Sequence, residues 1–291
     1  MLTLHTYHIR LHLHRPIIFG TFPGFYLRNA LVKALARHCR EPERMKGQQV
    51  VSCKGCGRIK NCLYYKLNLP VEVPEGIPGP MPFSLKVDSL ITGKYESGTL
   101  EFELVLFGRA NHCAGAFKEA LVEVGSNYGL GEQGQADSFK IVGFEKTATF
   151  DVATMLNAPT EEYNGLQLHF RHLKLSVKRM KSPPRLPLEY LLQMIETRLE
   201  NLTKCYGEPS VLKKEALTPL NSVKPTTHSE QFALCNYQYT GSGQGHWFLS
   251  GKVNFKGEMA QYLNLITIGS ILGIGRFTSY GFGSCHIDKF M

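Results

Sequence analysis

Apolar and polar residues alternate over residues 2–14, the first segment of the chain. One face of an extended chain there carries Tyr7, Ile9, Leu11 and Leu13, and the other carries His8, Arg10, His12 and His14. This alternation predicts a half-buried strand with a basic outer face. After a turn at Pro23-Gly24, the apolar positions over 26–40 fall three or four residues apart, which predicts an amphipathic helix.

Residues 41–80 are rich in proline, glycine and cysteine, so we expect an insertion there. After it the pattern predicts two strands, a helix and a further strand, at residues 83–91, 99–107, 112–126 and 137–150. The first two strands are joined by a turn at Gly93–Gly98. The resulting order, β-α-β-β-α-β, is that of the ferredoxin-like fold.

A polar stretch at 155–165 predicts a linker, and after it the same order repeats. The predicted elements are a strand, a helix, two strands, a helix and a strand, at 166–180, 187–204, 232–240, 246–255, 258–270 and 284–290. The sequence therefore predicts an α+β protein of two tandem ferredoxin-like (RRM-like) domains. We place them at 1–160, with the cysteine-rich insertion at about 41–80, and at 166–291.

Two glycine-rich stretches occupy matching places in this repeat, each between a predicted helix and a predicted strand. The second runs Gly273-Ile-Gly275-Arg276-Phe-Thr-Ser-Tyr280-Gly281-Phe-Gly283. The first, Tyr128-Gly129-Leu-Gly131, repeats the Tyr-Gly-x-Gly sequence of Tyr280–Gly283, which follows 152 residues later. The second stretch is not a dinucleotide-binding fingerprint, which opens a helix after a strand, because it follows a helix, lacks the spacing of the third glycine and leads into the final strand.

Two interpretations of the second stretch stay open. Its backbone amides can form a nest for phosphate, to which Arg276 adds a charge. Alternatively, its glycines serve only a tight turn. The first stretch is flanked by Glu132 and has no basic neighbour, so we expect it only to turn the chain.

The chain of 291 residues has a net charge of +9 and a pI of about 9.1, which favours a polyanionic partner, nucleic acid above all. A basic protein without such a partner is the alternative. The charge is concentrated: residues 28–66 hold ten lysines or arginines against two acids, and residues 171–185 hold six and no acid. A composition of 43% hydrophobic and 20% charged residues excludes a disordered chain.

The N-terminus lacks the basic and continuous apolar regions of a signal peptide. The most apolar late stretch, 265–275, has about half the length that a membrane span needs. We therefore expect a cytoplasmic protein without a membrane partner. Its eight cysteines are then thiols or metal ligands rather than disulfides.

With these features together, the chain resembles the CRISPR-associated endoribonucleases that process precursor guide RNA, members of the RAMP superfamily. Three regions carry the resemblance: the glycine-rich loop, the helix Leu188–Tyr206 behind a proline-containing turn, and the helix 26–40 with its following cysteines, as in one branch of the family. The resemblance implies that the protein binds CRISPR repeat RNA and cuts it without a metal ion. The 2′-hydroxyl attacks the adjacent phosphate, leaving a 2′,3′-cyclic phosphate and a 5′-hydroxyl.

The resemblance assigns catalysis to His38, because many relatives place a working histidine at the end of the first helix. Histidine suits acid–base work because its unperturbed pKa is about 6.5. Tyr26 and Lys46 are candidate companions, and no catalytic cofactor is implied. The structural alternatives are a half-buried helix-end histidine, a packing aromatic and a solvated cation. We expect four other histidines to be isolated surface or core residues: His172, His228, His246 and His286.

For RNA binding we expect the glycine-rich loop and the basic segment that begins the second half. The predicted contacts are Gly273, Gly275, Arg276, Gly281, Gly283, Lys174, Lys178, Arg179, Lys181 and Arg185. Lys174 and Lys178 share one face of the predicted strand 166–180, so they could follow a nucleic-acid backbone.

Four cysteines, Cys39, Cys53, Cys56 and Cys62, fall within 24 residues of a segment that has little to build a core. Four thiolates around zinc would fold such a segment. The Cys53-x2-Cys56 pair is modest evidence for such a site, and the x5 spacing to Cys62 is wider than in the usual zinc knuckle. A structural zinc, an iron–sulfur cluster, free thiols and a redox pair therefore all stay open.

The preferred function is a metal-independent endoribonuclease that matures CRISPR RNA. The leading alternative is a non-catalytic RNA-binding RAMP subunit of a CRISPR effector complex, whose other subunits would then be partners. A cysteine-cluster nucleic-acid-binding protein unrelated to CRISPR is a third interpretation. The first two differ at the first helix, since only a nuclease needs acid–base groups there.

Overall fold

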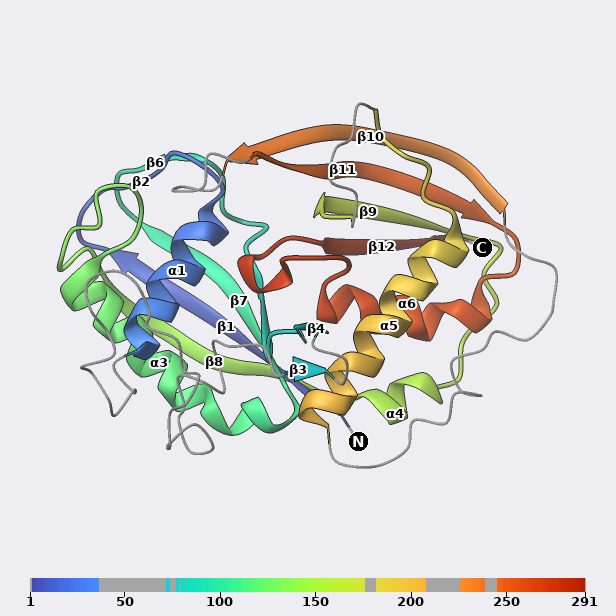
Figure 1. Cartoon of the computed structure of the whole chain (residues 1–291), viewed down its shortest axis with the longest axis horizontal. Coiled ribbons are helices and arrows are strands. Elements are labelled where there is room, and N and C mark those ends of the chain that lie inside the picture. Colours follow the sequence, from blue (N-terminus) through green and yellow to red (C-terminus); the bar gives the residue numbers. More distant parts are fainter. Residues whose placement is uncertain are drawn as a thin grey trace.

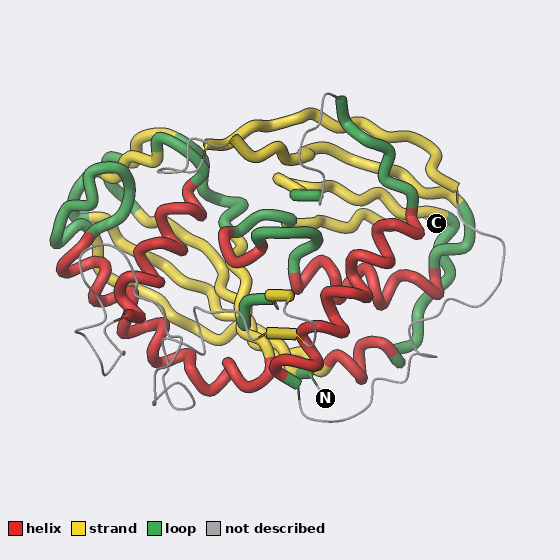
Figure 2. Tube along the Cα trace, viewed as in Figure 1, coloured by secondary structure: helices red, strands yellow, loops and turns green. Residues whose placement is uncertain are grey.

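The structure is a computed structural model, and it describes residues 2–36, 72–73, 77–78, 80–175, 182–207, 226–238 and 245–290. Its elements build two four-stranded sheets and the helices that cover them (Figures 1 and 2). None of the described helices is long and apolar enough to cross a membrane.

The first sheet has the strand order β5-β7-β1-β8. Its strands are β1 (Thr3–Leu13), β5 (Phe83–Lys86), β7 (Thr99–Phe107) and β8 (Phe139–Asp151), all antiparallel to their neighbours. The helices α1 (Pro23–Leu35) and α3 (Ala114–Glu123) lie over one face (Figure 1). In β1 the alternating apolar side chains are buried as predicted, because they face these helices.

The second sheet has the equivalent order β10-β11-β9-β12. Its strands are β9 (Gly165–Leu173), β10 (Thr226–Gln238), β11 (Gly245–Lys256) and β12 (Ser284–Phe290). The helices α5 (Leu188–Tyr206) and α6 (Ala260–Leu272) cover it. Both halves therefore have the ferredoxin-like topology, and the predicted α+β fold is confirmed.

Several elements differ from the sequence-based prediction. The expected turn at Gly93–Gly98 contains β6 (Gly93–Tyr95), which pairs with β2 (Ile17–Phe19). A short helix, α4 (Val152–Leu156), precedes the expected linker at 155–165 and extends into its first two residues. Its first turn is capped because Asp151 accepts a hydrogen bond from the Thr154 amide. Within the expected insertion, the described residues form a small ladder of β3 (Glu72–Val73) and β4 (Ile77–Pro78).

The two halves share their cores. The core of the first half contains Phe248 and Phe282 from the second, and the core of the second half contains Leu2, Leu4 and Phe107 from the first. All five side chains are buried, so separating the halves would expose large apolar areas. The glycine-rich loop lies between α1 and α5 (Figure 1), where these shared contacts meet. The division into domains at 1–160 and 166–291 stays a prediction.

The internal repeat is real, but its register differs from the one predicted. Gly131 packs against the Ile18 carbonyl, and the next amide, that of Glu132, donates to this oxygen over 2.9 Å. In the second half, Gly275 packs against the Lys174 carbonyl, and the amide of Arg276 donates to it over 3.0 Å.

The glycines two positions earlier, Gly129 and Gly273, both end helices and have φ of 67° and 79°. Gly129–Glu132 therefore corresponds to Gly273–Arg276, 144 residues later. The predicted match of Tyr128–Gly131 with Tyr280–Gly283 is wrong. The repeated feature is a turn whose amide donates to the segment that follows the first long strand of each half, at Ile18 in β2 and at Lys174 directly after β9.

Candidate functional site

The start of α1 packs against the glycine-rich loop, Gly273–Gly283. Phe282 lies between two stacked rings, with Phe22 at 4.1 Å and Phe248 at 4.0 Å between ring centroids. Gly24 lies so close to the loop that an added Cβ would stand 1.7 Å from the Tyr280 carbonyl oxygen. The first half of the chain therefore fixes the loop of the second by tight packing.

The chain after β5 holds the other side of the loop. A Cβ at Gly281 would lie 2.6 Å from Cγ2 of Val87, and φ of 87° at this glycine is unfavourable for any other residue. The hydroxyl of Ser284 donates to the Asp88 carboxylate, and the Arg171 guanidinium donates to the Asp88 carbonyl. These bonds tie the end of the loop to the first half.

A cation from α5 supports the loop from within the second half. The Arg198 guanidinium donates to Oγ1 of Thr278 over 2.6 Å and to the Leu272 carbonyl over 3.2 Å. Burial lowers the pKa of Arg198 to about 10, so the group still carries its charge at neutral pH. Its enclosed Nε has no hydrogen-bond partner among the described residues.

Most of the loop's identified amide bonds close the turn itself. The Ile274 amide donates to the Gly283 carbonyl, and the amides of Tyr280 and Gly281 close a 3-10 turn. The Arg276 amide donates to the Lys174 carbonyl, and the Gly283 amide donates to the His172 carbonyl. A Cβ at Gly283 would stand 1.9 Å from the Ile274 carbonyl oxygen. The fold alone therefore requires glycines in this loop, and these five amides are not free to hold a phosphate.

Basic and aromatic side chains gather beside the loop. The Arg28 guanidinium carbon lies 4.6 Å from the centre of the Tyr280 ring, and Arg276 is exposed. Lys174 is only 7% exposed, and its Nζ donates to the Trp247 carbonyl over 3.1 Å. Burial and the neighbouring Arg276 charge lower the pKa of Lys174. Because β9 ends at Leu173, Lys174 does not lie on the exposed strand face that the sequence predicted.

Phe277 is exposed at the tip of the loop and contacts the rings of His246, at 5.3 Å, and Tyr280, at 5.9 Å. Its φ of 64° and ψ of 27° lie in the left-handed region. That conformation costs a non-glycine residue about 1–2 kcal/mol. Burial and the charge of Lys174 lower the pKa of His246.

His172 occupies the boundary between the halves. Its Nε2 lies 2.7 Å from the hydroxyl of Tyr237, and its ring centroid is 5.0 Å from that of Phe22. Burial lowers the pKa of His172 and raises that of Tyr237, so the tyrosine hydroxyl stays protonated and can donate to a neutral imidazole. The prediction that His172 and His246 are isolated is therefore wrong; His228 is exposed on β10.

Of the predicted catalytic residues the structure describes Tyr26. Its ring packs against Phe19 at 5.5 Å, and burial together with the charge of Glu132 raises the pKa of its hydroxyl. Tyr26 lies in the first turn of α1, the end of the helix that contacts the glycine-rich loop. His38 and Lys46 lie outside the described residues.

Some of the other predicted site residues are described by the structure, and others are not. Lys178, Arg179, Lys181 and the four clustered cysteines lie outside the described residues, and Arg185 is exposed before α5. The described cysteines are Cys113, Cys205, Cys235 and Cys285, none of them in a disulfide. Burial raises the pKa of Cys285 to about 12, which leaves it a neutral thiol.

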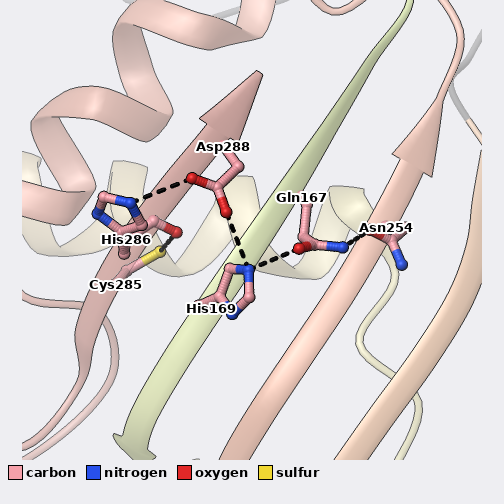
Figure 3. A network of polar contacts seen from close by, with 6 residues as sticks. All are labelled: Gln167, His169, Asn254, Cys285, His286 and Asp288. Atoms are coloured by element: carbon pink, nitrogen blue, oxygen red, sulfur yellow. Dashed lines mark hydrogen bonds and ion pairs between the residues drawn. The ribbon is translucent and has the colours of Figure 1, made fainter. Parts of the chain in front are cut away.

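A second polar cluster lies on the outer face of the second sheet (Figure 3). Asp288 bonds Nε2 of His169 and of His286, each at 3.1 Å, and Gln167 links His169 to Asn254. These contacts join β12, β9 and β11, so His286 is not isolated either. Among the described residues no three histidine, cysteine, aspartate or glutamate side chains are placed to hold a metal ion.

Sequence reasoning missed Arg28, Arg198 and Phe277. Arg198 had a usable signal, because it falls seven residues after Leu191 on the apolar stripe of its helix, where a cation needs a structural reason. Arg28 was counted only as part of the basic segment. Nothing in the sequence indicated that Phe277 would be exposed in a left-handed conformation.

Two family models match the chain. One, described as CRISPR-associated endoribonuclease Cas6, matches residues 144–285. The other, AF_1859_N, described as an N-terminal domain, matches residues 2–165. No curated protein shows a significant match to this chain.

Solved structures share the fold over nearly the whole chain. A Cas6 product complex has a TM-score of 0.59 at 18% identity and covers 98% of this chain and 100% of its own. Cas6 from Thermus thermophilus gives 0.55 at 14%, with 99% of each chain covered. A partial Cas6-RT-Cas1–Cas2 complex gives 0.55 at 12%, with 99% of this chain but 46% of that one covered. At these identities the similarity establishes the fold.

Proposed function

Because the model of the CRISPR-associated endoribonuclease Cas6 family matches residues 144–285, we propose that this chain is a member of that family, binds CRISPR repeat RNA and cuts it without a metal ion. The observation that carries the proposal is the glycine-rich loop held between α1 and α5, with Arg28, Arg276 and Lys174 beside it. Cations and exposed aromatic rings at one place are the groups that hold single-stranded RNA.

The reaction is an internal transfer at one phosphodiester. The 2′-oxygen forms a bond to phosphorus after losing its proton to a base, and the bond from phosphorus to the 5′-oxygen breaks as an acid protonates the leaving oxygen. The products are a 2′,3′-cyclic phosphate and a 5′-hydroxyl, and no water or redox partner enters. Acid–base assistance of this kind contributes a factor of roughly 10² to 10⁴ in rate.

His38 is the group we assign to proton transfer, with Tyr26 and Lys46 as companions. The raised pKa of Tyr26 limits its role, because a hydroxyl that stays protonated at neutral pH can donate a hydrogen bond but cannot serve as the base. A lysine cation would stabilise the charge that develops on the phosphorane. No catalytic cofactor takes part in this scheme, and subunits of a CRISPR effector complex stay predicted partners.

Incubating the protein with end-labelled repeat RNA in EDTA tests the proposal. We expect one cut and a 2′,3′-cyclic phosphate end. An RNA with a 2′-deoxy nucleotide at the cut site should bind equally and remain intact, because it lacks the nucleophile. Cleavage that requires Mg²⁺, or leaves a 5′-phosphate, would overturn the mechanism.

The variant His38→Ala tests the assigned residue. We expect it to bind repeat RNA but to cut at least about 100-fold more slowly. His228→Ala, which removes an exposed histidine of β10, is the matched control and should cut normally. Full activity of His38→Ala would remove that residue from the site. Tight binding without cleavage by the unmodified protein would instead favour the RNA-binding subunit.

A further inference from the structure

We propose that Phe277 is a stacking platform for one unpaired nucleobase of the bound RNA, with Arg276 beside it to meet the phosphate. The inference rests on the proposed function, because it names a contact through which the glycine-rich loop would hold the RNA. It concerns a side chain, whereas the glycines of the loop are explained by the fold.

The exposure of Phe277 is the first reason. Four large hydrophobic side chains are exposed among the described residues, and Phe277 is the only aromatic one, at 38% exposure. Within the described part of the chain it has two ring contacts, with His246 and Tyr280, at interplanar angles of 67° and 88°. Neither neighbour stacks on it in parallel, so the ring has surface left for a base.

The backbone at this position is the second reason. Within the loop, the residues with φ in the left-handed region are Gly273, Gly275, Phe277, Gly281 and Gly283. Four of the five are glycine, which takes this conformation without strain. A glycine at 277 would also relieve strain, and the core does not need the ring. The presence of a phenylalanine in this conformation indicates that the ring has a use outside the fold.

The charges around the ring identify the partner. The neighbouring Arg276 is exposed, and Arg28 lies over Tyr280 next to it. None of the ion pairs between described residues involves Arg28, Lys174 or Arg276. Cations that have no carboxylate partner among the described residues, beside an open aromatic ring, fit a nucleotide, whose phosphate would meet the cations and whose base would meet the ring.

Three variants separate stacking from structure. Phe277→Gly removes the ring and relieves the backbone, Phe277→Leu keeps apolar bulk without a π face, and Phe277→Tyr keeps the π face. We expect Phe277→Gly and Phe277→Leu to weaken repeat-RNA binding by roughly 5- to 150-fold at fixed salt, the range typical of one base–aromatic stack. Phe277→Tyr should bind within about 2-fold of the unmodified protein. Phe277→Gly should melt at an equal or higher temperature.

An RNA scan locates the base. Abasic substitutions along the repeat should include one position that weakens binding of the unmodified protein as much as Phe277→Gly does. With the RNA that is abasic at that position, Phe277→Gly should bind nearly as well as the unmodified protein, because the stacking contact is already absent from both complexes. Phe277→Gly should also leave the salt dependence of RNA binding unchanged. Arg276→Met should reduce the slope of log binding constant against log salt concentration by about 0.7 to 1 in magnitude.

The outcomes distinguish a failure of the stacking inference from a failure of the proposed function. If the unmodified protein cuts repeat RNA and Phe277→Gly binds it equally well, the stacking platform is wrong and the proposed function stands. Equal losses in all three variants would also overturn stacking, because tyrosine keeps the π face. If the unmodified protein binds no repeat RNA, the proposed function fails and this inference fails with it.

Discussion

Arg198 of α5 donates a 2.6 Å hydrogen bond to Oγ1 of Thr278, so a partly buried cation fixes the glycine-rich loop. The same guanidinium nitrogen also donates to the Leu272 carbonyl, at the end of α6. One side chain therefore anchors both the start and the middle of the loop.

Replacing Arg198 with methionine should destabilise the protein by about 1–3 kcal/mol. The loss comes from two acceptors left without their charged donor, partly offset because a charge no longer has to be desolvated. Urea unfolding followed by circular dichroism measures the change. Arg276→Met, which removes an exposed cation of the same loop, should stay within about 0.5 kcal/mol. Equal stability of the two variants would show that Arg198 does not anchor the loop.

Gly283→Ala should cost far more than alanine at another glycine with positive φ. Gly283 has a φ of 77°, and an added Cβ would overlap the Ile274 carbonyl oxygen at 1.9 Å. Gly98, with a φ of 101°, has open space around the same position. Gly98→Ala therefore measures backbone strain alone and should lower the free energy of unfolding by about 1 kcal/mol. The loss in Gly283→Ala should be larger by about 2 kcal/mol or more. Equal unfolding free energies would contradict the packing argument.

Much of the fold follows from local patterns. Alternation at Tyr7, Ile9 and Leu11 predicted β1, because burial on one face of a strand imposes a period of two residues. Apolar positions three or four residues apart predicted most of α1, because burial on one face of a helix imposes that spacing. The register of the repeat was mistaken because Tyr-Gly-x-Gly is conspicuous in the sequence. The true correspondence depends on the hydrogen bonds to Ile18 and Lys174.

The candidate site was harder to predict, because its contacts join distant residues. Phe22 stacks on Phe282, 260 residues away, and Tyr237 meets His172 across 65 residues. The spacing of apolar residues along one helix or strand gives no information on contacts between such distant residues. A single residue with the wrong polarity for its face, such as Arg198 on an apolar stripe, is the kind of signal that a sequence can give.

The cysteine cluster makes a separate prediction, which concerns residues outside the described part of the chain. If Cys39, Cys53, Cys56 and Cys62 hold a structural metal, the purified protein should contain about one zinc, or the iron of one cluster, per chain. Cys53→Ser should lose that metal. Cys113→Ser should keep it, because the described residues contain no group of potential metal ligands to which Cys113 belongs. Elemental analysis measures both. Protein free of zinc and iron would exclude the metal site.

The boundary between the halves should weaken in mild acid because of His172. Burial holds the pKa of this imidazole below its ordinary 6.5, although Asp88 opposes the shift and Arg171 adds to it. Below about pH 6.5 the unfolded chain binds a proton that the folded ring resists, so the free energy of unfolding falls as the pH drops. Above that pH the contribution of the neutral ring is complete.

The variant His172→Asn tests whether His172 lowers the free energy of unfolding as the pH drops. Asparagine tolerates the φ of 55° at this position, and it cannot take up the proton. The variant loses the contact with Tyr237 at every pH, so the informative quantity is the change in unfolding free energy between pH 7.5 and pH 5.5. Burial also lowers the pKa of His5 and of His246, so both proteins should lose stability over this range. The unmodified protein should lose more, and identical losses would show that His172 titrates normally in the folded state.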